Sequence, residues 1–248
     1  MRKILIILIT IIGGQLSYAQ TTTEDNFNDN QDLNSNTMSW GVKAGVNFYN
    51  FYGKERDYIF ASSATKFKPG FQAGVFVNTK IGKNLGLTHE LMFNQRRVGV
   101  SYEDTANQNY NSVVNSSYID LIPANISYQL SGFKFYAGPY VSMLVAANTK
   151  RKDENGNLVR DSSIFGDAKN DESKSYYLQK FDFGMNLGID YQLKNSFSIG
   201  LRYTHGFTDL FQNANSSANG NTKTDKIKIY NRGFMLSLAY DLTNFRLK

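Results

Sequence analysis

The segment at residues 181–193 alternates strictly between apolar and polar positions, as a β-strand with two different faces requires. The odd positions are apolar and comprise Phe181, Phe183, Met185, Leu187, Ile189, Tyr191 and Leu193. The even positions are polar or lack a side chain and comprise Asp182, Gly184, Asn186, Gly188, Asp190 and Gln192. Because successive side chains of a strand point to opposite faces, the segment is predicted to be a strand with one continuous apolar face.

The same alternation recurs along the chain and predicts eight strands in all. In chain order they are residues 40–50, 68–80, 85–100, 117–130, 133–147, 181–193, 197–210 and 227–242. Pro123 and Pro139 each remove a backbone donor, so we expect a bulge or a break in register near both prolines. The apolar positions before Pro123 are odd, at Ile119 and Leu121, whereas those after it are even. A bulge at Pro123 would produce this change of phase.

The expected connections alternate between short and long. Short turns are expected at residues 81–84, 131–132 and 194–196, and long polar loops at 51–67, 101–116, 148–178 and 211–226. Short periplasmic turns and long external loops are typical of barrels in the bacterial outer membrane, and an even strand number leaves both termini in the periplasm. The sequence therefore predicts an all-β fold, an eight-stranded antiparallel up-and-down transmembrane β-barrel.

The N-terminus has the features of a secretory signal. Arg2 and Lys3 precede an apolar run at residues 4–12, and the small residues Ser17 and Ala19 predict cleavage after Ala19. The apolar run is too short to span a bilayer, which needs about 20 residues. We therefore expect a signal peptide at residues 1–19, a flexible periplasmic leader at 20–39, and the outer-membrane barrel at 40–248. A periplasmic contact arm or a plug inside the barrel is the alternative for the leader.

The composition limits the possible partners. The chain has no cysteine, which excludes disulfides, thiolate metal sites and a lipid-modified cysteine. Its formal net charge of +6 suits contact with outer-membrane lipid and anionic lipopolysaccharide. No segment combines clustered Lys and Arg with stacking aromatics, so no nucleic-acid partner is expected. The 16 Tyr and 18 Phe residues could supply aromatic girdles at the membrane interfaces. An envelope protein could bind through the external loops or the leader.

Four stretches of the chain resemble the PorT-like outer-membrane β-barrel family of the Bacteroidota. They read GVKAGVN at 41–47, YIDLIP followed by NISY within 118–128, YAGPYV at 136–141 and FDFGMNLG at 181–188. The resemblance extends from Trp40 to about Leu242 and implies a small eight-stranded barrel of OmpA/OmpX-like architecture. The name-giving member is linked to secretion across the outer membrane, but architecture alone does not carry that role to this chain. Outer-membrane strands often end on an aromatic residue, whereas this chain continues past Phe245 to Lys248.

The polar face of the predicted strands carries several charges into the barrel. The inward-facing charged residues are Lys43, Glu90, Arg96, Asp182, Asp190 and Arg202. The interior of an eight-stranded barrel is just wide enough for side chains to fill it. Because isolated buried charge is strongly penalised, these residues are expected to form ion pairs and hydrogen bonds. The sequence thus predicts a structural polar network and a barrel without a large pore, with a narrow transport pore as the alternative.

An envelope enzyme that modifies lipid or peptide is a second alternative. His205 and Asp209 are the nearest approach to a catalytic pair, but four residues separate them by about 13 Å along a strand. No serine follows His205 by two residues, as a small-barrel lipid deacylase would require. We therefore assign no catalytic residue and expect no cofactor.

Two further patterns have simpler explanations than a metal site or a soluble barrel. Residues 153–157 begin like a calcium loop, but Leu158 occupies the position that needs glycine, so a hairpin turn at Asn155–Gly156 is expected instead. No metal site is assigned. A soluble ligand-binding barrel of the lipocalin type would carry the same alternation with its apolar face inward. The export signal and the charged face favour the apolar face outward.

Overall fold

The computed structural model describes most of the chain from Met38 to Thr243. The described residues are 38–53, 56, 59–62, 64–104, 107–153, 155–166, 177–193, 196–212 and 228–243. The predicted signal peptide, residues 20–37 of the predicted leader and residues 244–248 lie outside them. Within the described residues, no helix combines the length and the hydropathy needed to cross a membrane.

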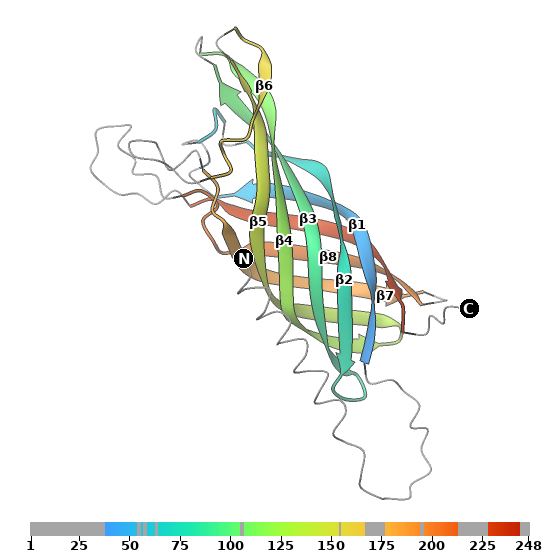
Figure 1. Cartoon of the computed structure of the whole chain (residues 1–248). Helices are drawn as coiled ribbons and strands as arrows, with labels where there is room; N and C mark the ends of the chain where they lie inside the picture. The colour runs from blue at the N-terminus through green and yellow to red at the C-terminus, as the bar shows by residue number, and fades with distance from the viewer. Residues whose placement is uncertain are drawn as a thin grey trace, which may run out of the picture. The chain divides into compact units, whose positions relative to one another are not determined.

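Eight strands close into one antiparallel ring (Figure 1). They are β1 Met38–Tyr52, β2 Lys66–Lys80, β3 Leu85–Glu103, β4 Asn109–Leu130, β5 Phe133–Lys152, β7 Phe181–Gln192, β8 Phe197–Gly206 and β9 Tyr230–Asp241. Each strand pairs with the next along the ring, and β9 pairs with β1 to close it. A short additional strand, β6 Leu158–Asp161, forms a hairpin with the end of β5. The predicted eight-stranded antiparallel fold is confirmed.

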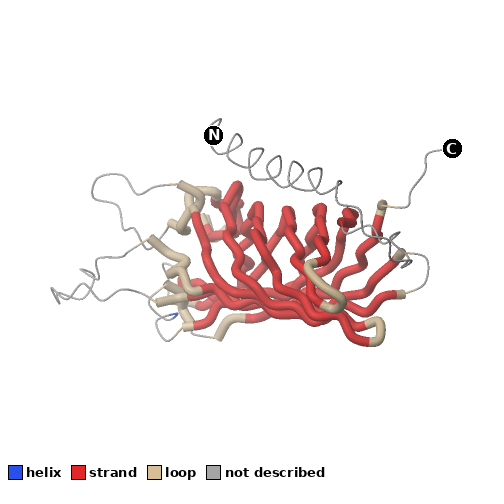
Figure 2. The backbone as a smooth tube through the Cα atoms, turned by 90° about the horizontal axis from the view of Figure 1, so that it is seen from below, coloured by secondary structure: helices blue, strands red, loops and turns tan. Residues whose placement is uncertain are grey.

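The two ends of the ring differ in their connections. The short connections β2–β3, β4–β5 and β7–β8 lie at one end, called the turn end. Figure 2 shows the strands side by side, with the connecting segments gathered at the two ends of the ring. Both described termini are at the turn end, where the Trp40 backbone N–H donates to Thr243 Oγ1 at 3.0 Å. The opposite end, where the other connections lie, is called the loop end.

The faces of the ring are segregated as an apolar outside and a polar inside. Along β7, Phe183 and Leu187 are exposed, whereas Asp182 and Asn186 are buried. The other strands of the ring repeat this pattern, and Leu236 in the middle of β9 is 48 % exposed. A continuous band of exposed apolar side chains is unfavourable in water but suits contact with hydrocarbon. The arrangement is the reverse of a lipocalin-type barrel.

The bulge expected at Pro123 is present. In the β3–β4 ladder, Thr88 pairs with Asn125 but Glu90 pairs with Ile122, so β4 has one extra residue around Pro123. Both Ile122 and Asn125 are buried, which shows that the inward phase changes across the proline. The bulge therefore resets β4 so that its apolar residues stay outside on both sides of Pro123.

The break expected at Pro139 is found on one side of its strand only. Pro139 pairs with Met185 in an uninterrupted β5–β7 ladder. On the other side, the β4–β5 ladder is irregular between the pairs Leu121↔Val141 and Ile126↔Ala137, opposite Pro123. One irregularity between β4 and β5 therefore accommodates both prolines.

Strands β3, β4 and β5 are longer than predicted and continue past the other strands at the loop end. The expected loop at 101–116 is wrong, because β3 and β4 pair as far as Glu103↔Asn109. The expected loop at 148–178 contains the β5–β6 hairpin, and its predicted turn at Asn155–Gly156 is confirmed. Gly156 has φ +79°, a conformation that glycine adopts without strain. Strand β8 ends at Gly206, four residues earlier than expected.

Leu236→Arg, in the exposed apolar band of β9, should lower the free energy of unfolding in lipid vesicles by about 2–4 kcal/mol, because it places a cation in hydrocarbon. Urea titration of the vesicle-inserted protein measures the change. Leu158→Arg on β6 is the matched control, since Leu158 is 53 % exposed but lies in the loop-end hairpin. Equal effects of the two substitutions would contradict the assignment of the apolar band to lipid.

Candidate functional site

A first cluster of ion pairs lies inside the barrel toward the turn end and centres on Glu90. Lys43 Nζ donates to Glu90 Oε1 at 3.0 Å, and Arg202 Nη2 lies 2.6 and 2.8 Å from the two carboxylate oxygens. Arg202 Nε also donates to the Tyr136 hydroxyl at 3.1 Å. These side chains come from β1, β3, β5 and β8 and are all buried, so the cluster ties together strands from around the ring.

Asp190 extends the Glu90 cluster. Its Oδ2 lies 3.8 Å from Lys43 Nζ and 3.4 Å from Lys134 Nζ. Lys134 retains 24 % of its side-chain exposure and is the most open charged group of the cluster. The cluster holds three cations and two carboxylates, so its formal charge is one positive unit.

A second cluster lies nearer the loop end and centres on Arg96. Arg96 Nη1 donates to Asp182 Oδ2 at 2.7 Å, and Nη2 donates to Asp120 Oδ1 at 2.9 Å. The guanidinium also stacks on aromatic rings, 4.2 Å from the Tyr118 centroid and 4.8 Å from that of Tyr49. With one cation and two carboxylates this cluster carries one negative unit, which balances the Glu90 cluster.

The structure buries all six predicted lumen residues and divides them between the two clusters. Lys43, Glu90, Asp190 and Arg202 belong to the Glu90 cluster, and Arg96 and Asp182 to the Arg96 cluster. Sequence reasoning missed Asp120 and Lys134. Asp120 lies between the outward Ile119 and Leu121, so the alternation itself could have identified it. Lys134 occupies an inward position at the start of β5, where alternation again gives the signal.

Glycines on β7 make room for two tyrosines that serve the ion clusters. A Cβ atom on Gly188 would lie 2.5 Å from the Tyr136 hydroxyl, and one on Gly184 would lie 2.6 Å from Tyr140 Cε1. Both rings therefore lie directly against the barrel wall. Tyr136 accepts a hydrogen bond from Arg202 in the Glu90 cluster, and Tyr140 donates to Asp182 in the Arg96 cluster at 3.2 Å.

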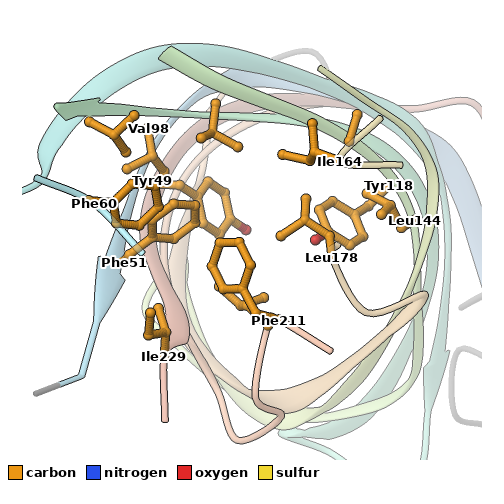
Figure 3. Close-up of a cluster of buried hydrophobic side chains, with 14 of the residues drawn as sticks. Tyr49, Phe51, Phe60, Val98, Tyr118, Leu144, Ile164, Leu178, Phe211 and Ile229 are labelled. Atoms are coloured by element: carbon orange, nitrogen blue, oxygen red, sulfur yellow. The ribbon is translucent and has the colours of Figure 1, made fainter. Parts of the chain in front are cut away.

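An apolar cluster, called the apolar cap, fills the interior at the loop end (Figure 3). Its members are Tyr49, Phe51, Phe60, Val98, Val100, Val114, Tyr118, Leu144, Ala147, Ile164, Leu178, Leu210, Phe211, Ile229 and Met235. Phe51 stacks on Phe60 with centroids 5.8 Å apart, and both meet Phe211 edge-on. Because Ile164, Leu178 and Phe211 come from connecting segments, these parts of the expected solvated loops fold inward and cover the ion clusters.

The residues considered for catalysis lie at the loop end, His205 near the end of β8 and Asp209 in the connection that follows it. His205 Nδ1 is 3.2 Å from the Tyr203 hydroxyl, and its ring packs 5.9 Å from that of Tyr52. Asp209 accepts a hydrogen bond from the Ile229 backbone N–H at 3.3 Å. Among the described residues, no group of three or more His, Cys, Asp or Glu side chains is arranged to hold a metal ion.

The ends of the β3–β4 and β5–β6 hairpins form a loop-end extension held by charged and aromatic contacts. Lys152 Nζ lies 2.8 Å from Asp104 Oδ2 and 5.2 Å from the Tyr110 ring centroid. Arg151 lies 5.4 Å from the Tyr102 ring centroid. Burial raises the pKa of the Tyr102 phenol above its ordinary value. These contacts join two hairpins that are remote in the sequence.

Comparison with known proteins identifies the family. A family model described as an outer membrane protein beta-barrel domain matches residues 18–212. No curated protein sequence matches the chain significantly. Among solved structures, the Ail protein of Yersinia pestis is similar, with 12 % identity over 82 % of this chain and 98 % of Ail, at a TM-score of 0.43. OprG of Pseudomonas aeruginosa has 14 % identity over 82 % of this chain and 95 % of its own, at a TM-score of 0.36. Neisserial surface protein A has 9 % identity over 81 % of this chain and 96 % of its own, at a TM-score of 0.42.

Arg96→Met should lower the free energy of unfolding in detergent micelles by about 3–5 kcal/mol, because it leaves two buried carboxylates without their cation. Urea titration followed by the fluorescence of Trp40, the single tryptophan, measures this change. Arg97→Met is the control, since Arg97 lies on the opposite face of β3 and its replacement should cost about 1 kcal/mol or less.

The Arg96 prediction has a second test in a double-mutant cycle. Combining Arg96→Met with Asp182→Asn should cost less than the sum of the two single substitutions, because the second removes a charge that the first left unpaired. Additive losses, or an Arg96→Met loss no larger than that of Arg97→Met, would show that the ion pairs do not stabilise the lumen.

Proposed function

The chain belongs to the family of outer-membrane protein β-barrel domains, and on that premise we propose that it is a closed barrel with a structural or interaction role. The observation that carries the proposal is the filling of its lumen. The Glu90 cluster, the Arg96 cluster and the apolar cap follow one another from the turn end to the loop end. Ions entering from either end would have to displace buried ion pairs and packed apolar side chains, at a large energetic cost.

The proposed orientation places the turn end in the periplasm and the loop end outside the cell. Its support is the difference in length between the two sets of connections. Both described ends of the barrel would then be periplasmic, as would the leader at 20–39 after cleavage of a signal peptide behind Ala19. Assignment to the PorT-like subgroup of the Bacteroidota is part of the same proposal and rests on the four motifs within 41–188.

The interaction surface we favour is the loop-end extension. Strands β3, β4 and β5 carry it past the apolar band, and contacts such as Lys152–Asp104 join its two hairpins. The hairpin of β6 adds exposed apolar side chains, Leu158 and Val159, that an envelope or extracellular protein could contact. We propose no enzymatic activity. His205 on β8 contacts the Tyr203 hydroxyl, whereas Asp209 lies in the connection after β8 and accepts a hydrogen bond from the Ile229 backbone N–H.

The closed lumen predicts that the purified protein, reconstituted in planar bilayers, produces no steady single-channel current. Conductance at 1 M salt measures this directly, and a porin inserted under the same conditions serves as the positive control. Insertion is verified by heat-modifiable migration of the reconstituted protein on gels. Steady, large currents from the inserted protein would contradict the proposal and favour a transport role.

A further inference from the structure

A groove of about 210 Å³ lies on the wall of the barrel near the loop end. Its lining residues come from β2, β3, β4 and the segment before β2, and they are Ala64, Lys66, Lys68, Gly99, Val100, Ser101, Asn111, Ser112 and Val113. None of these nine residues is acidic, and two of them are lysines. The groove shares Val100 with the apolar cap but has no residue in common with the Glu90 and Arg96 clusters.

The groove opens on the outer face of the sheet. Val98 and Val114 are buried members of the apolar cap, so they point into the barrel. Because side chains alternate along a strand, the adjacent Gly99 and Val113 lie on the outer face. The pair Val98↔Val114 and the pair Gly99↔Val113 are neighbours in the same ladder, so the two faces are assigned consistently for β3 and β4.

Gly99 creates the depth of the groove. It pairs with Lys66 across the β2–β3 ladder. A Cβ atom on Gly99 would lie 3.2 Å from Lys66 Cβ and 3.1 Å from Lys68 Cε, which is tighter than ordinary contact. A larger side chain here would therefore occupy the space between the two lysines and push the lysine stems apart.

Three cations gather at this position. Lys68 pairs with Arg97, two steps along the ladder from the Lys66–Gly99 pair. Arg97 is held in place, since its Nε donates to Asn115 Oδ1 at 2.9 Å and its Nη1 donates to the Pro69 carbonyl at 3.2 Å. A fixed guanidinium beside two flexible ammonium groups is suited to a phosphoryl group, which accepts several charge-assisted hydrogen bonds.

Lys66, Lys68 and Arg97 lie at the edge of the exposed apolar band. Phe71 and Phe93 belong to this band and pack with centroids 5.6 Å apart. Phe71 pairs with Gln95, and Arg97 is two residues farther toward the loop end, roughly 7 Å along the strand. A lipid whose acyl chains lie against these rings would bring its headgroup to the level of the groove.

We propose that this groove binds the phosphorylated headgroup of a lipid in the outer leaflet. The inference deepens the proposed function and rests on its orientation, which puts the loop end outside the cell. A lipid is preferred to a soluble phosphate because the groove continues into the apolar face, where only a molecule with acyl chains gains further contact. Lipid A, a diphosphorylated glycolipid, has the required chemistry.

The test is lipid retention by the inserted full-length exported protein. The protein is reconstituted in phosphatidylcholine nanodiscs that contain a few per cent lipid A, and native mass spectrometry after mild detergent release measures bound lipid A. Lys66→Gln/Lys68→Gln should weaken binding at least ten-fold. Lys80→Gln/Lys83→Gln is the matched control with the same charge change at the turn end, and it should bind as the unaltered protein does.

Gly99→Leu separates a built groove from a diffuse positive field. It keeps every charge but fills the hollow, so it should also reduce lipid A retention at least ten-fold. Heat-modifiable migration verifies that each variant is folded. Retention by Gly99→Leu equal to that of the unaltered protein, or equal losses in both lysine pairs, would overturn the proposal. Displacement of lipid A by equimolar pyrophosphate would overturn the choice of a lipid.

The result of the lipid A test does not depend on whether the lumen conducts ions. A barrel that conducts ions but retains lipid A at this groove would contradict the proposed closed lumen and leave the groove assignment standing. A barrel that conducts no ions, but whose lysine and glycine variants all retain lipid A, would contradict the groove assignment and leave the proposed closed lumen standing.

Discussion

Closure of the ring is the constraint on which the other features of this structure depend. In hydrocarbon no water is available to the backbone, so every strand needs a hydrogen-bonding neighbour on both sides. The last strand therefore has to return to the first, and the β1–β9 ladder runs from Gly41↔Asp241 to Tyr52↔Tyr230. With eight strands, the ring leaves an interior that side chains can fill completely. The narrow interior then dictates what kinds of side chain can face inward.

The interior solves two packing problems at once. Charged side chains are tolerated because they are balanced, four cations against four carboxylates across the two ion clusters. Long side chains fit in the interior because some inward positions of the wall are glycines, which carry no side chain. Gly184 and Gly188 leave space that Tyr140 and Tyr136 occupy, and those phenols form hydrogen bonds with Asp182 and Arg202. The glycines of β7 thus make room for tyrosines that contact the ion pairs formed between other strands.

Alternation along the sequence was sufficient to predict the fold and most of the lumen. It succeeded wherever a strand separates lipid from the interior, because the two faces then demand opposite side chains. Alternation failed to predict strand where the two faces no longer border lipid on one side and the interior on the other. Residues 101–103 and 109–116 form strand outside the apolar band, where polar residues are acceptable on both faces and the periodic signal disappears.

The apolar cap shows a different limit of sequence reasoning. Ile164, Leu178 and Phe211 are isolated apolar residues in polar segments, and no local pattern distinguishes a solvated position from one that folds back into the barrel. Asp120 and Lys134, by contrast, were available from the alternation and were overlooked. The lysine groove also required the structure, because only the ladder brings Lys66 opposite Gly99.

The ion pairs of the lumen join parts of the chain that are synthesised far apart in time. Glu90 and Arg202 are 112 residues apart, and Arg96 and Asp182 are 86 apart. A partly assembled sheet of β1 to β4 holds both partners of the Lys43–Glu90 and Arg96–Asp120 pairs. It lacks Asp182, Asp190 and Arg202, which β7 and β8 supply, so each cluster is incomplete until those strands arrive. Insertion of such an intermediate into hydrocarbon would expose incompletely paired charges, and the polar interior would in this way favour entry into the bilayer after the C-terminal strands have joined.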